Sequence, residues 1–231
     1  STPVAHHIYT TAANEGKRVQ ALGGAKNHMV VMPDADLESA AAAAVSAAFG
    51  SAGERCMAIS VAVVVGDIAD QFVDRVTELA RALVVRPGDQ PEAEMGPLIT
   101  RDALERVTSY VDGAVQEGGT LVLDGRTHDV PTEGFFIGPS IVDHVRPGMK
   151  VYDDEIFGPV LAIVRVDTYE EAVDLINENR FANGTSVFTR DGKTVRSFEY
   201  DIEVGMVGVN IPIPVPVGSF SFGGWKDSLF G

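Results

Sequence analysis

Hydrophobic residues along this chain follow two spacings, and each spacing predicts one kind of regular structure. Residues 59–65 form an apolar run, which is typical of a strand covered on both faces in a parallel sheet. In the segment that follows, apolar side chains recur every three or four residues, with charged side chains mostly opposite them: Ile68, Phe72, Val76, Leu79 and Leu83. This second spacing predicts a surface helix packed on a sheet.

The same two patterns continue over most of the chain. Strands are expected at residues 19–22, 29–32, 59–65, 120–123, 134–145, 160–166, 185–189 and 206–210. Helices are expected at residues 7–16, 37–49, 68–83, 104–115 and 193–200, and another begins at the capping-box sequence Thr168-Tyr169-Glu170-Glu171. The acidic segment before residue 160 and much of the Pro- and Gly-rich tail, residues 211–231, are expected to be irregular. Strands that alternate with helices predict an α/β fold, an open and mainly parallel sheet with flanking helices.

The bulk composition is that of an ordinary globular protein, with 231 residues, 45% of them hydrophobic and 22% charged. Its net charge of −15, from 33 acidic and 18 basic residues, argues against nucleic acid as a main partner, because phosphate binding requires a basic surface. No apolar stretch approaches the roughly 20 residues that a membrane helix needs. A single cysteine excludes an intramolecular disulfide, and we expect no metal site and a cytoplasmic location (the mitochondrial matrix in a eukaryote).

That cysteine, Cys56, follows a Gly-containing junction between the helix at 37–49 and the strand at 59–65. A thiol at such a junction can be presented into a cleft, with backbone N–H groups nearby to hold an oxyanion. The adjacent Arg55 would favour the thiolate, which is the nucleophilic form. The alternative is that Cys56 is a packed small hydrophobic residue, as lone cysteines often are.

Five segments occur in an order and at spacings that resemble the aldehyde dehydrogenase superfamily. They are Gln20-Ala21-Leu22-Gly23-Gly24, Gly53-Glu54-Arg55-Cys56, Glu155-Ile156-Phe157-Gly158-Pro159-Val160, Asn179-Arg180-Phe181-Ala182-Asn183-Gly184 and Phe222-Gly223-Gly224-Trp225-Lys226. The resemblance extends from residue 20 to residue 226 and so spans nearly all of the chain. The resemblance implies the catalytic-domain fold of that family and assigns Cys56 as the nucleophile of an NAD-dependent oxidation.

Within the family, the chain is most similar to the CoA-acylating branch, that of methylmalonate-semialdehyde dehydrogenase. The similarity lies in Gly24-Ala25-Lys26-Asn27-His28, in Arg55 directly before Cys56, and in the proline-rich segment 207–216. The hydrolytic members carry a glutamate where this chain has Ala21, which cannot accept a proton from water. The resemblance therefore implies that the acyl group passes to coenzyme A, with loss of CO2 and formation of propionyl-CoA or acetyl-CoA. The alternative is that another carboxylate serves as the base.

The resemblance also implies roles for single residues. Arg55 would bind the substrate carboxylate, since a guanidinium offers a planar fork, although it could instead stabilise a helix end or loop. The cofactor-binding positions would be Ser1 at the pyrophosphate, the backbone of Leu22 and Gly23 at the nicotinamide, Glu155 at the ribose hydroxyls and Phe157 beside the nicotinamide. Lys26, Asn27 and His28 receive no role, and we expect His28 to be a packed or edge histidine.

The chain also resembles only part of a family member. Residues 1–23 would be a remnant of the NAD-binding domain and residues 24–231 the catalytic domain with its tail. The parent enzyme would be a homotetramer or homodimer acting on a small semialdehyde and CoA, without a nucleic-acid or membrane partner, and the fragment would be inactive alone. Two alternatives remain open: a hydrolytic NAD(P)-dependent aldehyde dehydrogenase, and a non-catalytic truncated binding domain.

Overall fold

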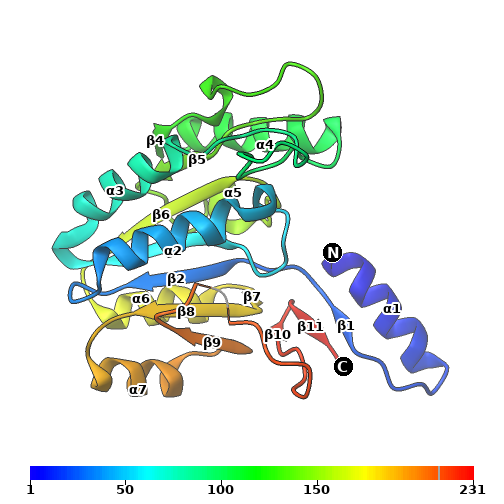
Figure 1. Ribbon diagram of the computed structural model, residues 1–231. Helices are drawn as coiled ribbons and strands as arrows, with labels where there is room; N and C mark the ends of the chain where they lie inside the picture. Colours follow the sequence, from blue (N-terminus) through cyan, green and yellow to red (C-terminus); the bar gives the residue numbers. More distant parts are fainter. Residues whose placement is uncertain (213) are drawn as a thin grey trace.

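Seven strands form one central sheet in the computed structural model, which describes residues 1–212 and 214–231 (Figure 1). In spatial order they are β4 (Thr120–Leu123), β5 (Ser140–Asp143), β6 (Val160–Val166), β3 (Ile59–Val65), β2 (Asn27–Val31), β8 (Gly184–Phe188) and β9 (Met206–Val209). The β4–β5 pair is antiparallel and every other neighbouring pair is parallel. The predicted α/β fold with a mainly parallel sheet is therefore confirmed.

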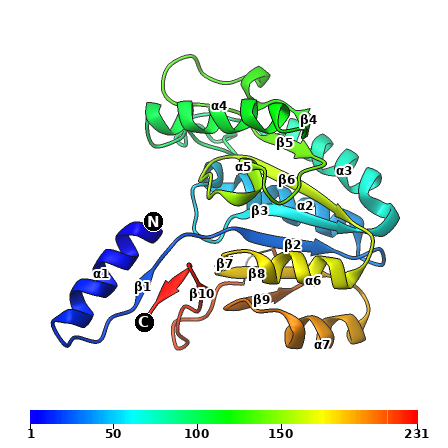
Figure 2. The same cartoon turned by 180° about the vertical axis from the view of Figure 1, so that it is seen from behind.

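Helices cover both faces of this sheet (Figures 1 and 2). α2 (Leu37–Phe49) and α3 (Ala69–Arg81) pack on one face, and α6 (Tyr169–Glu178) packs on the other. α2 is rich in alanine, and the side chains that it buries are mostly methyl groups, so it can approach the sheet closely. The remaining helices are α1 (Thr2–Asn14), α4 (Arg101–Gln116), α5 (Lys150–Asp153) and α7 (Gly192–Asp201), with short 3-10 turns at η1 (Gly50–Gly53), η2 (Gly66–Ile68) and η3 (Gly125–Thr127).

Two small antiparallel ladders lie outside the central sheet. β1 (Ala21–Leu22) pairs with β11 (Leu229–Phe230), and β7 (Phe181–Ala182) pairs with β10 (Trp225–Lys226). The end of the chain thus returns to its beginning, and α1 stands to one side of the sheet beside β1 and β11 (Figure 1). In α1 a single residue, Ala5, is buried.

The sequence misplaced several elements. The strand expected at 134–145 is limited to β5, because Gly134, Gly138 and Pro139, which precede Ser140, interrupt it. The acidic segment expected to be irregular contains α5, which at four residues is too short to show a periodic pattern. The strand expected at 19–22 is the two-residue β1, which pairs with the distant end of the tail.

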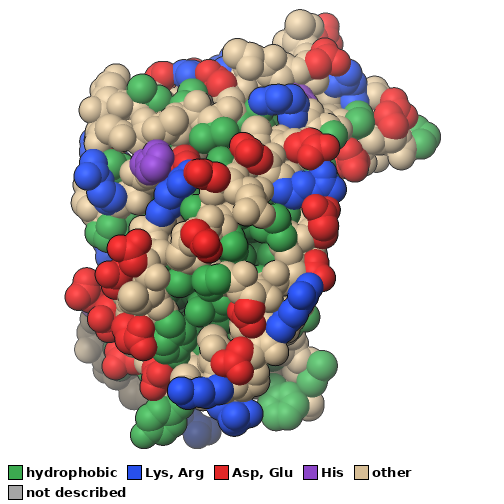
Figure 3. All heavy atoms as spheres, turned by 90° about the vertical axis from the view of Figure 1, so that its left-hand side faces the viewer, with side chains coloured by type: hydrophobic (Ala, Val, Ile, Leu, Met, Phe, Trp, Pro, Cys, Tyr) green, Lys and Arg blue, Asp and Glu red, His purple; other side chains and the backbone are tan. Residues whose placement is uncertain are grey.

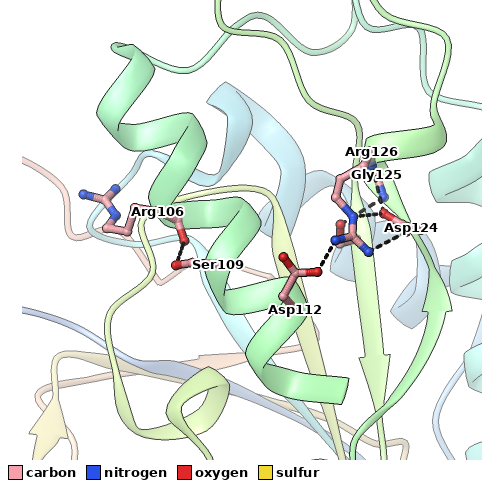
Figure 4. Close-up of polar contacts among 7 residues, drawn as sticks. Arg106, Ser109, Asp112, Asp124, Gly125 and Arg126 are labelled. Carbon is pink, nitrogen blue, oxygen red and sulfur yellow. Dashed lines mark hydrogen bonds and ion pairs between the residues drawn. The ribbon is translucent and has the colours of Figure 1, made fainter. Parts of the chain in front are cut away.

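α4 is fixed to the edge of the sheet by a cluster of charged side chains. Arg126 lies between Asp112 of α4 and Asp124, which follows β4, and forms ion pairs with both carboxylates (Figure 4). Arg106, one and a half turns earlier in α4, points away from this cluster. No helix among residues 1–212 and 214–231 combines the length and hydropathy needed to cross a membrane.

Candidate active site

The predicted nucleophile lies at the edge of the sheet where the parallel strands begin. The segments that precede β2, β3 and β6 converge there, because parallel neighbouring strands start at the same edge. They line one pocket with Lys26, Asn27, Arg55, Cys56, Glu155, Phe157 and neighbouring residues. Ligand sites of open parallel sheets are usually found at the opposite, carboxyl edge. The order of the strands thus brings together residues that are about 100 positions apart in the chain.

Cys56 is exposed, and the turn before it has an unusual backbone. Ser51 and Ala52 both have a φ of 52°, in the left-handed region that residues other than glycine rarely adopt. Gly53 has a φ of +70°, and a Cβ added there would lie 2.2 Å from the carbonyl oxygen of Gly158. Only glycine allows the nucleophile segment to approach the segment before β6 this closely. Strain of this kind is concentrated at functional sites.

Arg55 holds the end of α2 while it lines the same pocket. Its Nη2 donates to the carbonyl oxygens of Ser46 (3.0 Å) and Ala47 (2.9 Å), in the last turn of that helix. Its Nε is buried and has no hydrogen-bond acceptor in the structure. Desolvation lowers the pKa of the guanidinium, and the neighbouring Cys56 opposes that change. The side chain therefore has the helix-end contact considered above, and its buried Nε finds no acceptor among the described residues.

Glu155 and Phe157 follow α5 on the opposite wall of the pocket. One carboxylate oxygen of Glu155 accepts a hydrogen bond from the backbone N–H of Ala25 at 3.0 Å, and burial raises the pKa of this carboxyl. Phe157 has a φ of 54° and remains 40% exposed, although aromatic side chains are usually buried. Its ring is therefore available to a flat ligand, and Glu155 offers acceptors to hydroxyl groups.

Lys26, Asn27 and His28, which received no role from the sequence, are all buried. Lys26 Nζ donates to the carbonyl oxygens of Val151 (2.8 Å) and Asp154 (2.7 Å), and burial lowers its pKa to about 7. The His28 ring nitrogen Nε2 lies 3.1 Å from the Tyr152 hydroxyl oxygen, and burial lowers the pKa of the imidazole to about 3. His28 is thus a packed neutral histidine, as expected.

The other predicted cofactor positions, Ser1, Leu22 and Gly23, are not among the described residues that line this pocket. Ser1 precedes α1, and the hydroxyl oxygen of the next residue, Thr2, accepts from the N–H of Gly24 at 2.9 Å. Leu22 is half exposed in β1. A Cβ on Gly23 would lie 2.1 Å from the Asp227 carbonyl oxygen. Leu22 and Gly23 thus belong to the segment that leads into β2, and Ser1 is next to Thr2, which contacts that segment.

Sequence reasoning gave no individual role to Asn183, whose amide reaches the carbonyl oxygen of Cys56 at 3.0 Å. Its position directly before the buried strand β8 was the available signal, because a buried asparagine is costly unless its amide is bonded. Together the lining residues bring a thiol, a cation, a carboxylate and an exposed ring to one small space. That arrangement is suited to covalent catalysis on a small polar substrate.

Comparison with known proteins finds relatives that match the whole of this chain. The chain is 55% identical over its full length to malonate-semialdehyde dehydrogenase of Pseudomonas aeruginosa and covers 47% of that protein. The crystal structure of methylmalonate-semialdehyde dehydrogenase from Oceanimonas doudoroffii matches the whole chain with a TM-score of 0.98 and 54% identity, over 48% of its own length. A candidate methylmalonate-semialdehyde dehydrogenase from Sinorhizobium meliloti, complexed with NAD, matches with a TM-score of 0.97 and 50% identity, again over 48% of that chain.

More distant structures share the fold as well. Lactaldehyde dehydrogenase from Escherichia coli matches the whole chain with a TM-score of 0.92 and 32% identity, over 48% of its length. The chain therefore spans about half the length of the relatives it matches. The family model for the aldehyde dehydrogenase family matches residues 1–231. The chain belongs to the aldehyde dehydrogenase family.

Proposed function

We propose that this chain is the catalytic half of an NAD-dependent, CoA-acylating dehydrogenase of malonate or methylmalonate semialdehyde. The observation that carries the proposal is the pocket in which the exposed Cys56 thiol lies beside Arg55, while Ala21 stands where a hydrolytic enzyme has its base. The names of the relatives support the same substrate class.

Cys56 would act as the nucleophile. Its thiolate forms a bond to the aldehyde carbon, and the resulting tetrahedral oxyanion expels a hydride and becomes a thioester on the sulfur. The exposed position of Cys56 leaves the sulfur accessible to the aldehyde.

Glu155 and Phe157 would hold NAD, which accepts the hydride when it is bound. The second oxygen of Glu155 lies against Gly24, where an added Cβ would be only 2.9 Å from it, so glycine at this position leaves room for the carboxylate. A carboxylate that presents only acceptors suits the two hydroxyls of a ribose, and the exposed Phe157 ring suits a flat heterocycle. Ser1, Leu22 and Gly23 would contribute from the segment that precedes β2.

Arg55 would bind the carboxylate of the semialdehyde. Its contacts with α2 fix the guanidinium, and its side chain lines the pocket that holds Cys56. A substrate carboxylate would therefore meet a cation that is already anchored, at little further entropic cost to that side chain.

Coenzyme A would resolve the thioester. Ala21 is 5% exposed and carries no proton acceptor, so it cannot activate water. The CoA thiolate attacks the acyl carbon, and the carbon–sulfur bond to Cys56 breaks. A malonyl-type acyl group would lose CO2 and take up a proton while still bound to Cys56, before this transfer, so that the product is propionyl-CoA or acetyl-CoA.

The test is turnover of the full-length protein on methylmalonate semialdehyde with and without CoA. We expect NADH formation to depend on CoA and propionyl-CoA to be the product. Equal turnover to the free acid without CoA would refute the acylating proposal.

A hydrolytic dehydrogenase is the second candidate, because Glu155 is a carboxylate in the Cys56 pocket and burial raises its pKa toward that of a general base. It predicts that Glu155→Gln abolishes formation of the free acid but leaves NAD binding intact. Our proposal predicts instead that this variant weakens NAD binding. Arg55→Leu separates the two as well, since only a carboxylated substrate should lose affinity.

We further infer that residues 1–23 belong to an NAD-binding domain and residues 24–231 to the catalytic domain. The position of α1 and β1 outside the seven-stranded sheet supports this division. The parent enzyme would act in the cytoplasm as a homotetramer or homodimer. Size-exclusion chromatography with light scattering on the full-length protein would test the assembly.

A further inference from the structure

Two side-chain amides donate hydrogen bonds to the backbone of Cys56, the proposed nucleophile. Asn27 Nδ2 and Asn183 Nδ2 both donate to the carbonyl oxygen of Cys56, at 2.9 and 3.0 Å. Asn27 Nδ2 also donates to the carbonyl oxygen of Ala58 at 2.8 Å. Its Oδ1 accepts from the N–H of Gly184 at 3.1 Å and from the Asn183 amide at 3.4 Å. Because a carbonyl oxygen has two lone pairs, the amides occupy both acceptor sites of Cys56.

These amides add to the sheet ladder at its irregular end. β2 lies between β3 and β8, and its pairing with β3 shifts register between Asn27, which pairs with Ile59, and His28. At that irregularity the Asn27 side chain connects the segment before β3 with the first residue of β8, Gly184. Asparagine is unfavourable in strands, and burying its amide costs free energy unless every polar atom is bonded. A residue that breaks the local rules in this way is typical of a functional position.

The preceding residue, Lys26, makes the equivalent connection to the opposite wall. Its ammonium group donates to the carbonyl oxygens of Val151 and Asp154, at the end of α5, which have no helical partner there. The carboxylates nearest to it act through their charge without accepting a hydrogen bond from it: those of Asp153, Asp154 and Glu155. Ala25 adds its backbone N–H to Glu155. Residues 25 and 26 therefore fix the segment that carries Glu155.

We propose that Lys26 and Asn27 are positioning residues that form one bridge across the site. Asn27, together with Asn183, would fix the Cys56 backbone, and Lys26 would fix the segment of Glu155 and Phe157. The inference rests on the proposed function, in which Cys56 bears the adduct and residues 155 and 157 hold NAD. Two adjacent buried residues, at the entrance of β2, thus keep the donor carbon and the nicotinamide at a constant separation, on which hydride transfer depends steeply.

If Lys26 and Asn27 form such a bridge, replacing each residue should affect a different measurement on the full-length protein. Asn27→Ala should lower the single-turnover rate of NADH formation about 10- to 100-fold and change the pH profile of Cys56 alkylation by iodoacetamide, with an unchanged dissociation constant for NAD. Asn183→Ala removes one donor only, so it should have a smaller effect of the same kind, and it replaces Asn27→Ala if that variant does not fold. Alkylation is read on the peptide that contains Cys56 by mass spectrometry.

Lys26→Met should show the opposite pattern. We expect the dissociation constant for NAD to rise about 10-fold or more while alkylation of Cys56 without NAD stays as in the wild type. Lys26→Arg, which keeps the donors, should restore part of the affinity. Matched controls are Asn177→Ala, which removes a similarly bonded asparagine amide from α6, and Lys150→Met on the exposed side of α5.

Variants that lower only the melting temperature, or that change both readouts together, would overturn the proposal. Alkylation and NAD binding require neither an aldehyde nor CoA. A wild-type protein without CoA-dependent turnover would therefore refute the proposed function, while these two measurements would still decide whether the bridge exists.

Discussion

The two edges of the central sheet are built in opposite ways. At the carboxyl edge, helices begin with local caps: Asp36 accepts from the N–H of Ser39, Thr168 from Glu171, and Asp191 from Lys193 and Thr194. At the amino edge, side-chain contacts join residues far apart in the chain, such as Lys26 with Val151 and Asn27 with Gly184. Figure 3, which views the carboxyl edge, shows acidic and basic side chains spread around a hydrophobic centre.

We infer from this difference that the carboxyl edge contributes mainly to stability, whereas the amino edge carries the groups of the proposed reaction. The caps of the carboxyl edge are exposed, and those at Thr168 and Asp191 are contacts within a few consecutive residues, so each of these two should contribute a small and independent amount; Asp36 also accepts from the distant Arg190 at 3.0 Å. The amino edge buries Lys26, Asn27 and Asn183 and holds a strained turn before Cys56. Asn27 and Asn183 share the carbonyl oxygen of Cys56 as a partner, so a substitution at one should alter the hydrogen bonds of the other. The following predictions test that contrast.

The largest effect should come from the nucleophile at the amino edge. Cys56→Ala should lower turnover on the order of 10,000-fold or more, because no other thiol is present in this chain to form the thioester. Cys56 is exposed, so the melting temperature should stay close to that of the wild type. Rapid labelling of wild-type Cys56 by iodoacetamide near neutral pH would support a reactive thiol. A thiol that resists labelling would favour the non-catalytic alternative.

The next effect concerns the contact between the two walls of the site. Gly53→Ala should destabilise the protein by about 2 to 4 kcal/mol, because the new methyl group would overlap the Gly158 carbonyl and the residue has a positive φ. Gly88→Ala is the control, since an added Cβ there meets nothing within 4 Å. Urea denaturation of the full-length variants would measure the difference. Equal midpoints for the two variants would contradict the close approach.

The buried histidine of the amino edge should make stability depend on pH. Burial, and then the charge of Lys26, lower the pKa of His28 from 6.5 to about 3. Between these values the unfolded chain binds a proton that the folded chain does not. The free energy of unfolding should therefore fall as the pH is lowered from 6.5 toward 3, by at most about 1.4 kcal/mol per pH unit from this group. His28→Gln should reduce this slope, and His7→Gln on α1 is the matched control.

The smallest effect should come from the carboxyl edge. Thr168→Ala removes the hydroxyl that accepts from the N–H of Glu171, at an expected cost of about 1 kcal/mol. Turnover and NAD binding should not change, because α6 begins at the edge away from the pocket. Thr168→Ser, which keeps the hydroxyl, should retain most of the stability. A loss of turnover in Thr168→Ala would show that the two edges are coupled.

Local sequence rules predicted the carboxyl edge well. The capping box at Thr168 is present in part: Thr168 accepts from Glu171, while the Glu171 carboxylate accepts from Asp167, one residue earlier than expected. The apolar runs located the central strands, because a strand buried on both faces needs apolar residues at every position. Short elements such as α5 and β7 were missed, because a segment of four or two residues is too short to show a hydrophobic periodicity.

At the amino edge, the sequence by itself determined which residues were chemically suited to the reaction: a lone cysteine, an adjacent arginine, and an acid and an aromatic residue in one motif. Tertiary structure alone decided that these residues share a pocket, that Arg55 also holds the end of α2, and that Lys26, Asn27 and Asn183 hold the backbone around them. The physical reason is the range of the interactions. Caps and periodicity act within a few residues, whereas the order of parallel strands places segments from residue 25 to residue 184 at one edge.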